Sequence, residues 1–73
     1  MPDSKEALEN LLDKSVLIIV KGNVKIKGTL KGFDNHLNIL LEDAEEIANE
    51  TKNRKLGTLI IRGDGIEYIY PAE

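Results

Sequence analysis

The chain has 73 residues, a formal net charge of −3 at pH 7, a single histidine and no cysteine. A chain of this length buries only about 60% of its unfolded surface, so a lone core is marginal. The composition excludes disulfides and thiolate metal sites, and one histidine argues against a structural zinc site. Self-association is therefore the expected additional stabiliser.

The charge pattern and the first residues limit which classes of partner we expect. No run of 18 apolar residues occurs, so we expect no membrane span and no membrane partner. The first six residues are polar and acidic and do not resemble a signal peptide, which favours a cytoplasmic protein. The negative net charge argues against indiscriminate polyanion binding, but one strand region is locally basic. Its lysines are Lys21, Lys25, Lys27 and Lys31.

The first element expected is a helix over residues 4–13. Asp3, with Glu6 three residues later, has the spacing of a helix N-cap pair. A one-sided apolar stripe follows, made of Leu8, Leu11 and Leu12. Such a stripe must be covered, and an open end of a sheet is the expected partner.

Two strands joined by a tight turn are expected next. Residues 16–20 are a short β-branched run, and Gly22-Asn23 supplies hairpin turn chemistry. Residues 24–33 then alternate between one apolar face and one mostly basic face. This alternation places Gly28 and Gly32 on the inward face, where missing side chains allow sharp bending.

Three further strands complete the predicted fold. Residues 37–42 alternate as a third strand, a polar turn is expected within 47–55, and residues 56–61 form a fourth strand. Residues 66–70 make a fifth strand that Pro71 is expected to stop. Five short antiparallel strands after one helix predict a mainly β fold, in which a strongly bent sheet forms a small open barrel.

Two polar clusters interrupt the apolar alternation, one at residues 34–38 and one at residues 61–65. If their turns lie side by side, the ring of His36, the guanidinium of Arg62 and the carboxamide of Asn38 converge. A base can be sandwiched between ring and cation while the carboxamide reads its edge. The pattern therefore predicts a nucleotide pocket rather than a catalytic centre.

Each of these residues taken singly has an ordinary structural explanation. Asn is common in turns, and Gly63 and Gly65 flank Asp64 as turn chemistry demands. Only the joint pattern favours a pocket. No serine or cysteine nucleophile lies near a base in the sequence, and no glycine-rich loop precedes a helix. We therefore expect neither an enzyme nor a cofactor.

Two longer motifs carry a resemblance to a known family. The first runs from Gly28 to Asp43 (GTLKGFDNHLNILLED) and the second from Leu59 to Ile66 (LIIRGDGI). Both occur at the spacing of the Sm/LSm family, and the chain resembles its archaeal Sm-like members from about Leu8 to Pro71. The related Hfq branch carries a Tyr-Lys-His run where this chain has Arg62, so the LSm branch fits better.

The resemblance implies a single Sm-like domain over residues 1–73, with its first motif region at about 15–46 and its second at about 56–70. It implies the Sm fold, a small SH3- or OB-like barrel, closed into a homo-oligomeric ring of usually seven subunits. In that ring, strand four of one subunit pairs with strand five of the next. Leu37 stands where many relatives carry methionine, which is a volume-conserving exchange.

The resemblance also implies binding of uridine-rich single-stranded RNA near the pore of the ring, in RNA processing or ribonucleoprotein assembly. The matching positions are His36, Asn38, Arg62, Gly63 and Asp64. Ionised Asp64 only accepts hydrogen bonds, so we expect it to hold the Asn38 amide and favour uracil over cytosine. Asp34 is expected to shape its turn. A structural or protein-interaction ring without base-specific binding is the alternative.

Overall fold

The structure is a computed structural model and describes residues 3–48 and 53–72. Within these residues a short helix precedes five strands, which form one antiparallel sheet in the order β4-β3-β2-β1-β5. The elements are α1 (Ser4–Glu9), β1 (Ser15–Val20), β2 (Val24–Phe33), β3 (Ile39–Ile47), β4 (Asn53–Ile61), the 3₁₀ turn η1 (Gly63–Gly65) and β5 (Ile66–Pro71). The predicted mainly β fold, a bent five-stranded sheet with an N-terminal helix, is confirmed.

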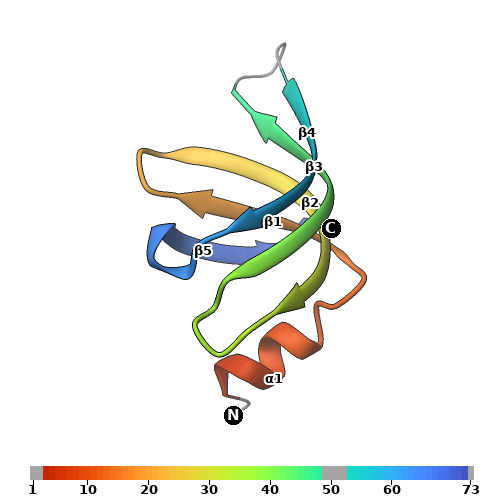
Figure 1. Ribbon diagram of the computed structural model, residues 1–73, viewed down its shortest axis with the longest axis vertical. Coiled ribbons are helices and arrows are strands. Elements are labelled where there is room, and N and C mark those ends of the chain that lie inside the picture. The colour runs from red at the N-terminus through yellow and green to blue at the C-terminus, as the bar shows by residue number, and fades with distance from the viewer. Residues whose placement is uncertain (1–2, 49–52, 73) are drawn as a thin grey trace.

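The sheet curls around its own apolar face (Figure 1). The alternating apolar residues of the strands point into this curl, and α1 covers one end of it through Leu8. The fully buried side chains of the core are Val16, Ile18, Leu30, Ile39 and Leu41. The curl stops short of a closed barrel, because β4 and β5 remain the two edges of the sheet.

The helix begins where the sequence predicts but is shorter than residues 4–13. Asp3 caps it, since its carboxylate accepts a hydrogen bond from the Glu6 amide at 2.9 Å. The helix ends at Glu9, and the following amides tighten to three-residue spacing. Asp13 then turns the chain with a φ of 67° and donates its amide to the Leu30 carbonyl. None of the helices in the described ranges is long and apolar enough to cross a membrane.

The alternation in β2 is interrupted, which corrects one expectation. The β2–β3 register shifts between Leu30 and Gly32, so Lys31 is an extra residue on the β2 side. Phe33 therefore pairs with the fully buried Ile39 and packs against the core. Gly32 pairs instead with Leu40, away from the core. Gly28 does face inward as predicted, but Gly32 does not.

Strands β3 and β4 are longer than predicted and shorten the polar connection between them. Glu45 lies opposite Lys27 on one side and opposite Lys55 on the other, while Glu46 lies opposite Arg54. Opposite charges on neighbouring strands support pairing, so these charged residues belong to strands rather than to a loop. β3 also begins at Ile39 instead of residue 37, because the preceding residues form the turn described below.

Candidate functional site

The two polar turns lie against each other, as predicted. The turn between β2 and β3 (residues 34–38) meets the turn between β4 and β5 (residues 62–65). The Gly63 amide donates a hydrogen bond to Asn38 Oδ1 at 2.9 Å. A Cβ atom on Gly63 would overlap the His36 carbonyl oxygen and come within 2.9 Å of the Leu37 carbonyl oxygen. Only glycine therefore allows this close approach of two backbones.

Four of the residues singled out from the sequence line one cavity. His36, Asn38, Arg62 and Asp64 surround a space of about 340 Å³. His36, Arg62 and Asp64 are exposed, and Asn38 is half-buried at the base of the turns. The fifth residue, Gly63, does not line the cavity but holds the two turns together. The structure thus brings the predicted ring, cation and carboxamide to one place.

Asp34 organises the first turn, as the sequence suggested. Its Oδ1 accepts from the backbone amides of His36 at 2.9 Å and Asn38 at 3.0 Å. The Leu37 amide donates to the Asp34 carbonyl, and the Asp34 amide donates to the Asn38 carbonyl. One carboxylate oxygen therefore satisfies two turn amides that otherwise lack a partner in a strand.

The orientation of the Asn38 carboxamide is set by Asp34 and Gly63, not by Asp64. Asn38 Nδ2 donates to Asp34 Oδ2 at 3.0 Å, while Asn38 Oδ1 accepts from the Gly63 amide. Flipping the carboxamide would put two donors together at Gly63 and two acceptors together at Asp34. The expectation that Asp64 holds this amide was wrong. Asp64 Oδ2 instead lies 3.5 Å from Arg62 Nη2, on the exposed side of the cavity.

The contacts of Asp34 within the turn also change the acidity of its carboxyl group. The side-chain hydrogen bond from Asn38 lowers the pKa of Asp34 below its ordinary value of 3.8, and the backbone amides of Asn38 and His36 lower it further. These donors favour the charged form. Asp34 therefore stays ionised at neutral pH and keeps accepting from Asn38.

The locked carboxamide leaves a defined pair of groups for a ligand. Asn38 has two amide N–H donors and an oxygen with two lone pairs. Asp34 takes one N–H and Gly63 takes one lone pair, so one donor and one acceptor of the carboxamide remain for a ligand. A planar ligand edge with a complementary acceptor and donor matches this pair.

Sequence reasoning missed the position of Leu37. It was expected at the start of the third strand, but it lies in the turn with a φ of 61° and is 44% exposed. A branched apolar residue in the left-handed region is uncommon. The only sequence signal was its place between His36 and Asn38 in a polar cluster, where a turn competes with a strand.

Comparisons with known proteins place this architecture in a family. The family model of the LSM domain matches residues 6–71 of this chain. The chain belongs to the LSM-domain family. An Archaeoglobus fulgidus relative that carries the name snRNP Sm-like protein is 41% identical over 71 residues, which cover 97% of this chain and 92% of that relative.

Solved structures of LSM-domain relatives have the same fold. The P. aerophilum SmAP1 heptamer superposes with a TM-score of 0.90 at 36% identity, covering 100% of this chain and 97% of that one. The Pyrococcus abyssi Sm protein, solved in complex with a uridine heptamer, superposes with a TM-score of 0.89 at 37% identity. That comparison covers 97% of this chain and 100% of the other. The family resemblance of the two sequence motifs is thereby confirmed.

Proposed function

We propose that this LSM-domain protein assembles into a homo-oligomeric ring, most simply a heptamer, that binds uridine-rich single-stranded RNA. The observation that carries the proposal is the locked Asn38 carboxamide at the base of a cavity flanked by His36 and Arg62. Uracil presents an N3–H donor beside a carbonyl acceptor, which complements the free oxygen and N–H of Asn38. Cytosine presents the opposite pattern at these positions and would require the disfavoured flip.

The faces of a bound base would be covered by the other two side chains. The imidazole of His36 and the planar guanidinium of Arg62 are both groups on which bases stack. Arg62 also supplies positive charge near a phosphate. Asp64, paired with Arg62, would orient that guanidinium, a role we assign from the 3.5 Å contact.

The ring is supported by where the exposed apolar side chains lie. Ile60 is 69% exposed on edge strand β4, and Tyr68 and Tyr70 are 64% and 42% exposed on edge strand β5. Unpaired sheet edges invite pairing with another chain. Joining β4 of one copy to β5 of the next would cover both edges and place Ile60 beside the tyrosines. Because the contact joins two different surfaces, its repetition forms a ring when the rotation between neighbouring copies closes, as in the heptamers of similar structures.

The comparisons support the number of subunits and the ligand. One similar structure is a heptamer and another was solved with a uridine heptamer. We therefore propose seven subunits with one base per pocket. RNA processing or ribonucleoprotein assembly in the cytoplasm is the setting we propose, and the role is binding rather than catalysis.

The test measures the affinity of the assembled protein for oligouridine and oligocytidine at one fixed salt concentration, because backbone contacts depend on salt. His36→Ala and Arg62→Ala should each weaken oligouridine binding, since a stacked base contributes about 1–3 kcal/mol in single-strand sites. Arg54→Ala is the matched control. It removes the same charge from an exposed position on β4 that does not line the cavity.

Two outcomes would contradict the proposal. Equal losses for Arg54→Ala and Arg62→Ala would indicate general electrostatic attraction rather than a base pocket. A ring that ignores both oligonucleotides would favour the alternative, a structural or protein-interaction ring in which the turns only connect strands.

A further inference from the structure

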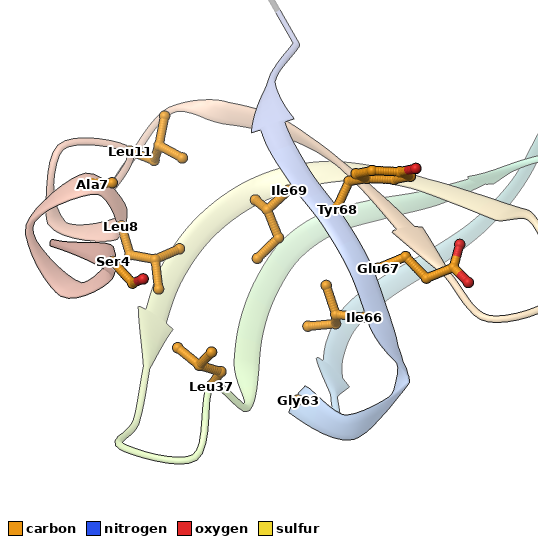
Figure 2. Close-up of a pocket in the computed structure, with 10 residues that line it drawn as sticks. All are labelled: Ser4, Ala7, Leu8, Leu11, Leu37, Gly63, Ile66, Glu67, Tyr68 and Ile69. Carbon is orange, nitrogen blue, oxygen red and sulfur yellow. The ribbon is translucent and has the colours of Figure 1, made fainter.

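An apolar groove runs along the back of the two turns that form the nucleotide pocket. It has a volume of about 330 Å³ and lies between α1, the residue 34–38 turn and β5 (Figure 2). Leu8 and Leu11 line it from the helix, and Ile66 and Ile69 line it from the strand. Leu37 points into it from the turn, as Figure 2 shows. The groove is therefore a mostly apolar surface beside the free edge of β5.

The groove and the nucleotide pocket use alternate residues of the same backbone. His36 and Asn38 line the pocket, whereas Leu37 between them lines the groove. On the second turn, Arg62 and Asp64 line the pocket and Gly63 lines the groove. The two sites are thus opposite sides of one pair of turns.

The turns are packed too tightly to move separately. Gly63 contacts the backbone of His36 and Leu37 so closely that a Cβ atom there would overlap it. The Gly63 amide also holds Asn38 Oδ1 at 2.9 Å. A displacement of Leu37 on the groove side must therefore shift His36, or break the hydrogen bond that orients Asn38.

In the single subunit, the backbone of Leu37 is held by its amide hydrogen bond to the Asp34 carbonyl and by Gly63, but its side chain is only partly covered. Its side chain is 44% exposed, and its φ of 61° is unfavourable for a branched residue. Such backbone strain persists only where surrounding structure imposes it. Burial of the Leu37 side chain by a second molecule would supply a constraint that the free subunit lacks.

The occupant that fits the groove is a second copy of this chain. Leu59 and Ile61 of β4 face the apolar side of the sheet, as Ile66 and Ile69 of β5 do. A neighbouring β4 paired to the edge of β5 would continue that apolar row over the groove. The same alignment carries Ile60 to the opposite face, where Tyr68 and Tyr70 are exposed.

We propose that Leu37 is a positioning residue through which the neighbouring subunit, seated on the groove, sets the geometry of the nucleotide pocket. Assembly and binding of a single nucleotide then strengthen each other. The inference rests on the proposed ring and pocket, and adds that the neighbouring subunit holds the geometry of the pocket more firmly than the single subunit does. Because coupling between binding sites is reciprocal, a nucleotide must stabilise the ring by the same factor as the ring raises its affinity.

The experiment uses uridine 5′-monophosphate, which cannot bridge two subunits as a longer RNA would. Ring dissociation is followed by sedimentation in mild guanidinium, with and without the nucleotide, and cytidine 5′-monophosphate is the matched ligand control. A ligand that binds assembled and free subunits equally shifts nothing. We expect the uridine nucleotide to shift the dissociation equilibrium by at least about fivefold per subunit, the lower end of typical coupling.

Two groove variants separate positioning from simple loss of contact. Leu37→Ala should weaken the ring, lower its affinity for the uridine nucleotide several-fold and shrink the nucleotide-dependent shift. Leu11→Ala removes an equal side chain from the same groove, but on α1 rather than on either turn. It should weaken the ring while the shift persists.

The outcomes distinguish this inference from the function on which it rests. Nucleotide binding to the assembled ring without any shift in dissociation would overturn the coupling and leave the RNA-binding ring standing. Equal shifts for Leu37→Ala and Leu11→Ala would overturn the role of Leu37. An assembled ring that binds no oligouridine would overturn the proposed function and the coupling together.

Discussion

At the scale of single residues, the decisive feature is that Asn38 is held from two sides. Asp34 and Gly63 each take one of its hydrogen-bonding groups, so the carboxamide that we propose to read base identity cannot flip without breaking two contacts. Sites built to match hydrogen-bonding groups reject mismatched partners because buried groups are left unpaired. Discrimination therefore depends on Asp34, which does not line the cavity itself.

Asp34→Asn should reduce the preference for uracil over cytosine. The new amide has one acceptor oxygen in place of two, and holding the two turn amides with that oxygen turns an NH2 group toward Asn38 Nδ2. The lost hydrogen bond removes what orients the Asn38 carboxamide, and we expect the affinity ratio per nucleotide to fall several-fold. The measurement is the ratio of oligouridine to oligocytidine affinity. Asp64→Asn is the matched control and should change this ratio less. A larger change in Asp64→Asn would show that Asp64, rather than Asp34, orients the Asn38 carboxamide.

Binding of oligouridine should decline in acid through the same carboxylate. The pKa of Asp34 is lower in the folded protein than its ordinary 3.8, so the stabilisation is present above about pH 3.8. It is lost as pH falls through the folded value, when Asp34 takes up a proton. Affinity measured from pH 7 downward should therefore stay level to pH 3.8 and fall only below it. The part of this acid decline that comes from Asp34 should be missing in Asp34→Asn. If the affinity of the wild type and of the variant depended on pH in the same way, Asp34 would not be its cause.

Gly63→Ala should destabilise the protein because the added methyl group overlaps the His36 carbonyl oxygen. Overpacking of this kind typically costs about 1–3 kcal/mol, and rigid backbone on both sides favours the upper end. Guanidinium unfolding at fixed protein concentration measures the loss. Gly65→Ala is the matched control, since nothing lies within 4 Å of its added carbon. Equal stability of the two variants would show that the turns can separate.

At the scale of elements, two register shifts in the β2–β3 pair bend the sheet. One lies between Lys27 and Thr29, and the other between Leu30 and Gly32. Extra residues in one strand increase local twist and bend the strand. The first shift coincides with Gly28, which lies against Ala44 and Leu41 of β3. The bend lets one short sheet enclose its own core and brings the two turns together.

Gly28→Ala should therefore be costly and Gly32→Ala should not. A Cβ atom on Gly28 would lie 3.2 Å from the Ala44 Cα and 3.3 Å from the Glu42 carbonyl oxygen. The nearest atom to one on Gly32 is 4.0 Å away. We expect a loss of about 1–2 kcal/mol for the first variant and less than about 0.5 kcal/mol for the second, by guanidinium unfolding. Equal losses of stability would mean that both positions need glycine for its backbone conformation rather than for close contact with a neighbouring strand.

At the scale of the whole molecule, the sheet has two edges that a single chain leaves open. A domain of this size buries too little surface to be strongly stable alone. Pairing between subunits would add burial and cover the exposed residues of β4 and β5 at the same time. The proposed ring would therefore stabilise the fold of each subunit and also repeat the binding surface around the ring.

Ile60→Lys should shift the protein from ring to smaller species. It replaces an exposed apolar side chain on edge strand β4 with a charge, losing about 1.5–3 kcal/mol of burial at every contact. Sedimentation should show a wild-type mass near seven times that of the 8.1 kDa chain and a lower mass for the variant. Thr29→Lys is the control, since it lies on central strand β2 opposite Glu42. A monomeric wild type would contradict the ring itself.

The sequence by itself determined the local features. The N-cap at Asp3, the hairpin at Gly22-Asn23 and the five strands follow from residue chemistry and period-two patterning, which act over a few neighbours. The two polar turns were also predictable, because their residues interrupt apolar alternation at strand ends, but their convergence entered the sequence argument only as a condition. The family resemblance added the expected ring and ligand.

Only the tertiary structure decided what depends on contacts distant in sequence. The extra residue at Lys31 turned Phe33 inward and Gly32 outward, because register is set by the partner strand rather than by alternation. Asn38 Oδ1 accepts from the Gly63 amide, 25 residues along the chain, and this contact together with Asp34 orients the carboxamide without Asp64. Leu37 lies in a turn with a positive φ and lines the groove, instead of starting the third strand as predicted. These outcomes depend on three-dimensional packing, which a one-dimensional pattern does not encode.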